Sequence, residues 1–229
     1  MSDFLLIHGA CHGGWCWEHV AAVLRGCGHR VVAPDLPCED LNADLDSYAD
    51  VAAAALGDTA GDVVVVGHSL GALVVPLVAT RVQVRRIVML AGIVGSPGLS
   101  MADLASIDHD RDMRLGPEDL ETDDEGRFRF SAAGARRVLF GDCPPQLAAG
   151  AASRLRFQRS MWTQVSHFEA WPSCETMSIT CTGDLVVNPV WSDRVARERL
   201  GVEPVHLAGG HSPFLSRPTE LAQVLGSGL

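Results

Sequence analysis

Lysine is absent from the 229 residues, so all 18 basic side chains are arginines. Without a lysine amine the chain cannot form a Schiff base or use a lysine as general base, which excludes those enzyme mechanisms. The 28 acidic residues outnumber the basic ones and give a formal net charge of −10. Nucleic-acid binding depends on a basic surface that displaces counterions from phosphates, so no nucleic-acid partner is expected.

Long apolar runs are also missing, since no stretch approaches the ~20 residues that a membrane span requires. The first three residues lead into a short apolar segment without the pattern of a secretory leader. The seven cysteines are irregularly spaced and form no CxxC pair, which favours reduced thiols. These features predict a cytoplasmic protein with no membrane partner. The use of arginine and alanine is typical of a GC-rich bacterial gene.

Strand-like and helix-like patterns alternate along most of the chain. The expected strands are residues 4–7, 31–33, 63–66, 87–91, 177–182 and 204–207, and the expected helices are residues 17–26, 45–56, 69–81, 190–200 and a last one from 218. The run of four valines at 63–66 has no polar break, which favours a strand buried on both faces. The alternation predicts an α/β fold with a mostly parallel central sheet and helices on both faces.

The pattern changes after Gly92. Up to residue 171 the chain holds charged clusters and short amphipathic helices, expected at 132–140 and 146–155. We interpret residues 93–171 as a helical cap inserted over the sheet, and residues 1–92 and 172–229 as the core. The acidic run at 121–125 is expected to be a solvated loop rather than a binding patch.

A serine stands between two glycines directly after the four valines. Residues 67–71 read GHSLG, which matches G-x-S-x-G, and an apolar helical stretch follows. This setting forces the serine into a strained turn at the carboxyl edge of the sheet, and the glycines avoid collisions with neighbouring elements. We predict that Ser69 is a catalytic nucleophile, with an inert serine in a tight turn as the alternative. Pro76 is expected to kink or shorten the helix.

A serine nucleophile needs a base, and in such enzymes the acid and the base follow it in the chain. His211 lies after an expected strand and before a helix, so it belongs to a loop at the same edge; the alternative is a surface histidine. Asp184 ends an earlier strand and is the predicted acid that orients the imidazole. The alternative is a turn or helix-capping aspartate. Asp193 lies within an expected helix and points elsewhere.

The first loop, residues 8–15 (HGACHGGW), is rich in glycine, which lets backbone approach a substrate closely. The backbone N–H groups of Ala10 and Leu70 are the predicted oxyanion hole. Gly9, His12 and Trp162 are the predicted substrate contacts, although Trp162 is as well explained by packing between cap and core. His8 and His12 are read as a hydrogen-bonded loop pair, so no metal site is predicted.

The loop at 8–15, the GHSLG turn at 67–71 (called the elbow below), and the segments around Asp184 and His211 together resemble the plant methylesterase and hydroxynitrile lyase branch of the α/β hydrolases. The resemblance covers about two-thirds of the chain and fades through the cap. It implies the α/β-hydrolase fold. Lyase members carry a threonine in place of Gly9 and a lysine in place of Ser212, so the resemblance implies an esterase rather than a lyase.

The leading hypothesis is hydrolysis of a small, largely apolar carboxylic ester through an acyl-enzyme on Ser69, with no cofactor. Two alternatives stay open: a lyase or carbon–carbon bond enzyme that uses the same base, and a catalytically weak ligand-binding relative. The expected partner is a small-molecule substrate, and a homodimer is left open. Acyl and alcohol preference, stereochemistry and pathway are not predicted.

Overall fold

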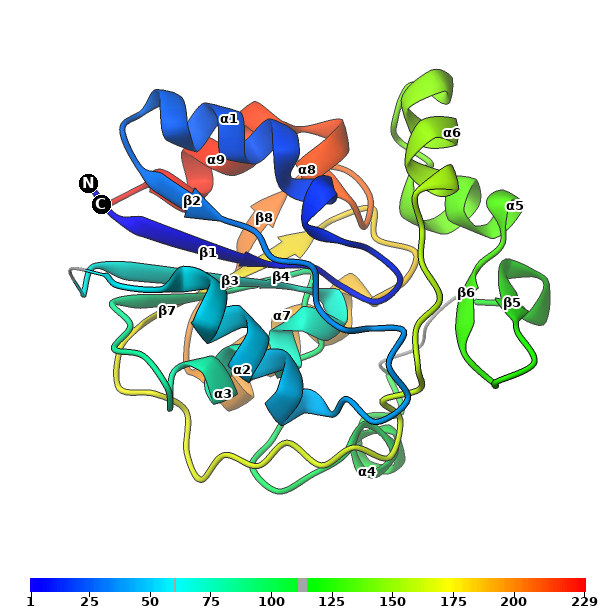
Figure 1. The fold of residues 1–229 in the computed structure, drawn as a ribbon, viewed down its shortest axis with the longest axis horizontal. Helices are drawn as coiled ribbons and strands as arrows, with labels where there is room; N and C mark the ends of the chain where they lie inside the picture. The colour runs from blue at the N-terminus through cyan, green and yellow to red at the C-terminus, as the bar shows by residue number, and fades with distance from the viewer. Residues whose placement is uncertain (60, 111–114) are drawn as a thin grey trace.

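The computed structural model describes residues 1–59, 61–110 and 115–229; residues 111–114 of the predicted cap lie outside the described residues. Its main sheet has strand order β2-β1-β3-β4-β7-β8, with every neighbouring pair parallel (Figure 1). The strands are β1 (Asp3–Ile7), β2 (Arg30–Val32), β3 (Val63–His68), β4 (Arg86–Leu90), β7 (Glu175–Cys181) and β8 (Val205–Leu207). Every residue of β3 and β4 is buried, which explains their unbroken apolar sequence and confirms the predicted sheet.

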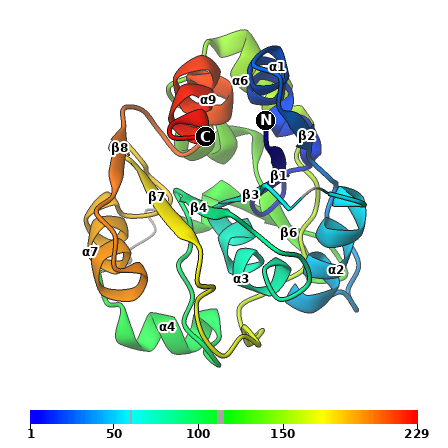
Figure 2. The same cartoon turned by 90° about the vertical axis from the view of Figure 1, so that its left-hand side faces the viewer.

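Helices cover both faces of this sheet. On one face lie α1 (Glu18–Gly26) and α9 (Pro218–Gly226), and on the other lie α2 (Leu45–Leu56), α3 (Val75–Val78) and α7 (Pro189–Leu200) (Figures 1 and 2). The bounds of α2 agree with the prediction because both ends carry clear signals. Asp44 accepts a hydrogen bond from the Ser47 backbone N–H at 2.7 Å, and Gly57 at φ +61° ends the helix. Within the described residues, every helix is too short or too polar to cross a membrane.

The prediction of a single helix at 69–81 is wrong. The chain instead forms a 3₁₀-helix, η2 (Ser69–Leu73), and then the short α3, which has Pro76 in its first turn. Proline lacks the N–H that would continue a helix from the preceding turn, so the predicted shortening is confirmed. The helix expected from 17 also starts differently, as the 3₁₀-helix η1 (Gly14–Trp17) followed by α1.

Residues 93–171, called the insertion below, leave the sheet after β4 and return to β7. Described in it are α4 (Met101–Ile107), η3 (Pro117–Asp119), the hairpin β5 (Leu120–Thr122) with β6 (Phe128–Phe130), α5 (Ala132–Gly134), the π-turn η4 (Ala135–Leu139) and α6 (Pro145–Ser153). The insertion is thus partly β rather than wholly helical. Only part of the helix expected at 132–140 is α-helical. The acidic run 121–125 is largely exposed, as predicted, but forms part of the hairpin.

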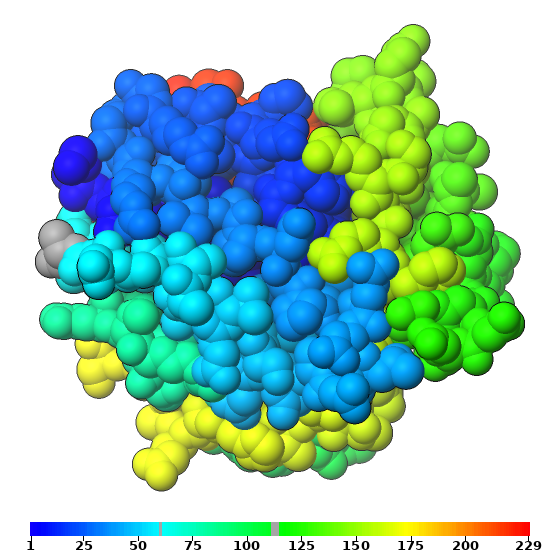
Figure 3. All heavy atoms as spheres, viewed as in Figure 1, coloured from blue at the N-terminus to red at the C-terminus, as the bar shows by residue number. Residues whose placement is uncertain are grey.

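The insertion lies beyond the carboxyl ends of the strands, at the right of Figure 1. After α6 it runs back along the core, where its yellow-green atoms lie against the N-terminal third (Figure 3). The Arg156 backbone N–H donates to the Cys11 carbonyl at 2.7 Å, and the Arg159 N–H donates to the Cys38 carbonyl at 2.8 Å. These bonds hold the insertion against the loop after β1 and against the segment between β2 and α2.

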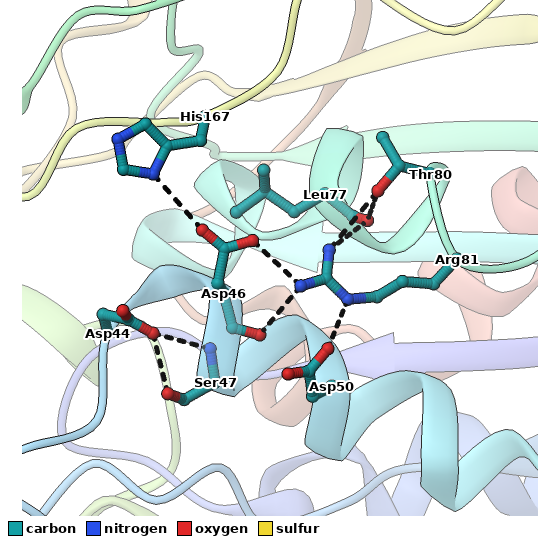
Figure 4. Close-up of polar contacts among 8 residues, drawn as sticks. All are labelled: Asp44, Asp46, Ser47, Asp50, Leu77, Thr80, Arg81 and His167. Atoms are coloured by element: carbon teal, nitrogen blue, oxygen red, sulfur yellow. Dashed lines mark hydrogen bonds and ion pairs between the residues drawn. The ribbon is translucent and has the colours of Figure 1, made fainter.

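A polar cluster anchors the last part of the insertion to the start of α2. The Arg81 guanidinium contacts Asp50 at 2.6 Å and Asp46 at 2.9 Å, which joins the loop after α3 to α2 (Figure 4). His167 of the insertion lies 3.4 Å from the same Asp46. The cluster is half-exposed and contains no group that faces the pocket described below, so its role is to hold the elements together.

Candidate active site

The turn after β3 places Ser69 in a strained conformation. Its φ is +51°, a region that side chains other than glycine rarely adopt. A Cβ on Gly67 would lie 2.4 Å from a Val75 methyl, and one on Gly71 would lie 2.5 Å from the His8 carbonyl oxygen. Both glycines are therefore required by close packing of the turn against its neighbours, as the motif predicts.

Three residues other than glycine have positive φ in the described chain: Cys11 (+65°), Ser69 (+51°) and Ala91 (+44°). They follow β1, β3 and β4, three adjacent strands of the sheet. Each such residue costs on the order of 1–3 kcal/mol, and such strain is kept where function requires a particular geometry. The strain therefore makes the carboxyl edge of these strands the candidate functional edge.

His211 and Asp184 form a buried pair at this edge. His211 Nδ1 lies 2.8 Å from Asp184 Oδ2, and both side chains are only 2% exposed. The other carboxylate oxygen, Oδ1, accepts hydrogen bonds from the backbone N–H groups of Val186 (2.7 Å) and Val187 (3.0 Å). Because Asp184 accepts at Nδ1, the pair fixes the imidazole with its proton on Nδ1 and leaves Nε2 free to accept one.

His68, the residue before Ser69, joins the elbow to the histidine loop. Its Nε2–H donates to the His211 carbonyl oxygen at 2.9 Å, and the two rings lie 4.6 Å apart between centroids. On the other side, the Ser69 carbonyl oxygen accepts from the Ile93 N–H at 3.0 Å. The elbow is thus fixed on both sides by neighbouring loops.

Ser69 and His211 open into one pocket of about 170 Å³. Among the residues that the structure describes, the lining is almost wholly apolar and includes no acidic or arginine side chain. The sheet edge contributes Ala10, His12, His68, Ser69, Leu70, Val186 and His211, and the insertion contributes Ile93, Met101, Leu115, Leu120, Phe128, Phe130, Leu139, Ser160, Met161 and Trp162. Ser69 and His211 therefore come from the core, and most of the remaining walls come from the insertion.

Four other predicted site residues also line this pocket: Ala10 and Leu70 beside Ser69, His12, and Trp162, which is 42% exposed. Gly9 is not among the lining residues. It lies behind the reactive groups, where a Cβ would be 2.8 Å from His68 Nδ1 and 2.9 Å from Ser69 Cβ. The close approach that its lack of a side chain permits is to the elbow rather than to a substrate.

Gly9→Ala is expected to lower kcat/KM for an ester by roughly 100-fold, because the new methyl group displaces His68 or Ser69 by a sizeable fraction of an ångström. Steady-state kinetics on a p-nitrophenyl ester measure the effect. Gly26→Ala is the matched control, since nothing lies within 4 Å of a Cβ built there. Equal activity of both variants would contradict the packing argument.

His8, His12 and His68 are buried beside the site. Burial lowers the pKa of His8 to about 4 and that of His12 to about 3, and it holds the pKa of His68 well below its ordinary value of 6.5. His8 Nδ1–H donates to the Gly9 carbonyl and His12 Nδ1–H donates to the Ala10 carbonyl, both at 2.8 Å. The expected loop bonds are therefore present, although each ring bonds to backbone rather than to the other ring.

The stability of the protein should fall steeply in mild acid. These three histidines stay neutral in the fold but bind protons below about pH 6.5 when the chain is unfolded. Proton binding therefore stabilises the unfolded state relative to the folded one. Their contribution is fully present above pH 6.5 and is lost as the pH falls towards 4. We expect the free energy of unfolding to drop by roughly 3–5 kcal/mol between pH 6.5 and 5.

Urea unfolding at a series of pH values measures the slope of the free energy of unfolding against pH. His8→Gln should make the slope shallower, whatever its effect on stability at pH 7. The exposed His19 provides the control, because His19→Gln should leave the slope unchanged. A wild-type stability that is constant from pH 6.5 to 5 would refute the expectation.

The hairpin walls Leu120, Phe128 and Phe130 were not predicted as site residues. The signal was present in the sequence: an apolar residue at every second position of 128–130, preceded by an acidic turn with a glycine. The helix α4 was also missed, although Ser100 and Asp103 form a capping box at its start. The described residues contain no group of three or more His, Cys, Asp or Glu side chains placed to hold a metal ion.

Known proteins share this architecture. The model of the alpha/beta hydrolase family matches residues 4–224. A carbendazim-hydrolysing esterase of Nocardioides sp. is 37% identical over 114 residues, which span 45% of this chain and 47% of that protein, about half its length. A methyl jasmonate esterase of Vitis vinifera is 25% identical over 97% of this chain and 94% of its own. The crystal structure of polyneuridine aldehyde esterase aligns with a TM-score of 0.81 at 18% identity, over 98% of each chain.

These similarities agree with the resemblance seen in the loop at 8–15 and the elbow. The family match spans almost the whole chain, including the elbow, the loop that carries Asp184 and the loop that carries His211. The parallel sheet and the strained serine at its carboxyl edge are the features that the family fold requires. The chain belongs to the alpha/beta hydrolase family.

Proposed function

We propose that this protein is a serine hydrolase that cleaves small, largely apolar carboxylic esters through an acyl-enzyme on Ser69. One observation carries the proposal: the strained Ser69 opens into the same apolar pocket as His211, whose other ring nitrogen is held by the buried Asp184. The esterase names of the relatives support the same reaction class.

In the proposed reaction, Ser69 Oγ attacks the carbonyl carbon of the ester while His211 Nε2 accepts its proton. The Asp184 carboxylate stabilises the resulting imidazolium. The N–H groups of Ala10 and Leu70 stabilise the negative charge on the carbonyl oxygen. Collapse of the tetrahedral intermediate breaks the bond to the alcohol, which leaves with the proton from His211. Water, activated by the same base, then cleaves the acyl-enzyme and releases the acid.

The pocket supports the substrate class. A cavity of about 170 Å³ is close to the roughly 150 Å³ that accepts a benzene ring in an engineered protein cavity. An apolar lining favours a neutral group, because a buried charge without a partner loses its hydration. We infer that the acyl group is uncharged and about the size of one ring.

Matched p-nitrophenyl esters test this substrate class. We expect kcat/KM for p-nitrophenyl benzoate to exceed that for the p-nitrophenyl half-ester of succinic acid at least about ten-fold, because the free carboxylate would have to enter an apolar pocket. Equal rates for the two esters would contradict the assignment of the pocket to a neutral acyl group.

The lyase alternative is not favoured. Gly9 and Ser212 occupy the positions where lyase members of the resembling branch carry a threonine and a lysine, and Ser212 is buried beside the base. A neutral serine provides no cation for a leaving anion. The relatives compared above carry esterase names.

We also propose that the insertion acts as a cap that shapes the acyl pocket, since its residues supply most of the walls.

A bacterial source, a cytoplasmic location, a homodimer and the lack of nucleic-acid or membrane partners remain predictions from the sequence. All seven cysteines are free thiols, which is compatible with a reducing compartment.

A further inference from the structure

The loop that carries His211 is held at three consecutive residues by three separate parts of the chain. The Gly209 carbonyl accepts a hydrogen bond from the Gly183 N–H at 2.8 Å, next to the acid loop. The His211 carbonyl accepts from His68 Nε2–H at 2.9 Å, next to the nucleophile. These two contacts tie the base to the segments that carry the other two members of the triad.

The third contact comes from the insertion. The Gly210 N–H, between the other two, donates to Asp142 Oδ2 at 2.8 Å. Asp142 lies in the short connection between η4 and α6. A Cβ on Gly209 would lie 2.6 Å from Asp142 Oδ2, and one on Gly210 would lie 3.1 Å from Oδ1. The carboxylate therefore packs against the backbone of the two glycines, and a side chain at Gly209 would force it to move.

Asp142 makes the one charged contact of the three, and hydrogen bonds to a carboxylate are stronger than those between neutral groups. It does not line the pocket, so it does not touch the substrate. Its effect on the reaction has to pass through the backbone of the histidine loop. A shift of about 1 Å in a catalytic group can cost on the order of 100-fold in rate, so this backbone contact matters for the chemistry.

We propose that Asp142 is a positioning residue: by binding the Gly210 N–H it holds His211 between Asp184 and Ser69, so that the base is correctly placed only when the insertion is seated on the core. This inference rests on the proposed function for its kinetic consequence. The placement of the imidazole itself does not depend on which substrate is cleaved.

Steady-state kinetics on p-nitrophenyl benzoate compare Asp142→Ala with Asp142→Asn. The alanine variant is expected to lose roughly 10- to 100-fold in kcat with KM within about two-fold, because the base moves while the pocket does not. The asparagine variant keeps an acceptor oxygen of the same reach and should retain kcat within about three-fold. Asp142→Ser, whose side chain is too short to reach Gly210, replaces the alanine variant if the latter does not fold.

Asp123→Ala is the matched control. Asp123 is also an aspartate of the insertion that accepts backbone hydrogen bonds, from Glu125 (3.0 Å) and Arg127 (2.9 Å), but it lies in the hairpin turn. Its loss should leave kcat unchanged. An Asp142→Ala variant as active as Asp123→Ala would overturn the proposal, and so would an asparagine variant as impaired as the alanine one.

A second measurement needs no substrate. The proton on His211 Nδ1, bonded to Asp184, should give a strongly downfield ¹H NMR signal in the full-length protein. We expect this signal to persist in Asp142→Asn and in Ser69→Ala, and to broaden or vanish in Asp142→Ala. Loss of the signal in Asp142→Ala supports the positioning role even if the wild type cleaves no ester, which would refute only the proposed function. An unchanged signal together with unchanged kcat refutes the positioning role alone.

Discussion

Ser69→Ala is expected to abolish ester hydrolysis, with kcat falling by a factor on the order of 10⁶ and residual rates close to those of the oxyanion hole and binding alone. The reason is that the variant loses the only hydroxyl on the turn between β3 and η2, and no acyl-enzyme can form. Alanine keeps the Cβ and leaves the backbone turn in place. Release of p-nitrophenol and the melting temperature, measured side by side, check both statements.

Covalent labelling provides the companion measurement. A fluorophosphonate should add to the wild type once, and trypsin, which has only arginine sites in this chain, should place the adduct in the peptide of residues 31–81. That peptide also contains Ser47, so fragmentation has to assign the adduct to Ser69. Turnover that survives Ser69→Ala, or an adduct on Ser47, would remove Ser69 from its role.

Asp184→Asn is expected to reduce kcat about 10⁴-fold with little change in KM. The two backbone N–H groups of Val186 and Val187 need an acceptor, so they will hold the amide oxygen of the asparagine. Its NH₂ group then faces His211 Nδ1, at the place of the oxygen that now lies 2.8 Å away. A donor there forces the imidazole proton onto Nε2, and the ring can no longer accept the proton of Ser69.

Asp193→Asn is the matched control for this variant. Asp193 also pairs with a histidine, His206, at 2.9 Å, but the imidazole of that pair is half-exposed and the pair lies away from the pocket. Its kcat should equal that of the wild type. Near-normal activity of Asp184→Asn would show that the tautomer of His211 is not controlled by this carboxylate.

The sequence predicts the sheet and the elbow because the signals are local. Four consecutive valines mark β3, and the glycines at 67 and 71 are dictated by contacts of under 3 Å within the turn and its neighbours. The pairing of Asp184 with His211 could be anticipated because both follow strands of one parallel sheet, and the carboxyl ends of such strands share one edge. Such a prediction needs only the knowledge that each residue directly follows a strand of the parallel sheet.

The insertion is predicted less well because its structure depends on distant contacts. The helix expected at 132–140 becomes largely a short π-helix. Next to it Gly134 approaches the Asp119 backbone closely, a contact that periodicity does not reveal. Asp142 looks like an ordinary polar residue before two prolines until the structure brings Gly210 to it from 68 positions away. Gly9 is predicted to contact the substrate because glycine lets backbone approach closely, but the sequence does not reveal that the close neighbours are His68 and Ser69.

The division of the pocket has a consequence for how such a protein can change. The residues of the proposed triad lie before position 71 and after position 183, whereas most of the pocket walls lie between positions 93 and 162. Substitutions that enlarge or narrow the space for the substrate can therefore accumulate in one uninterrupted stretch of the gene while the reaction itself is conserved. A new substrate preference could arise by exchanging that stretch alone, provided that the exchanged piece keeps Asp142, which accepts a hydrogen bond from the Gly210 N–H in the loop that carries His211.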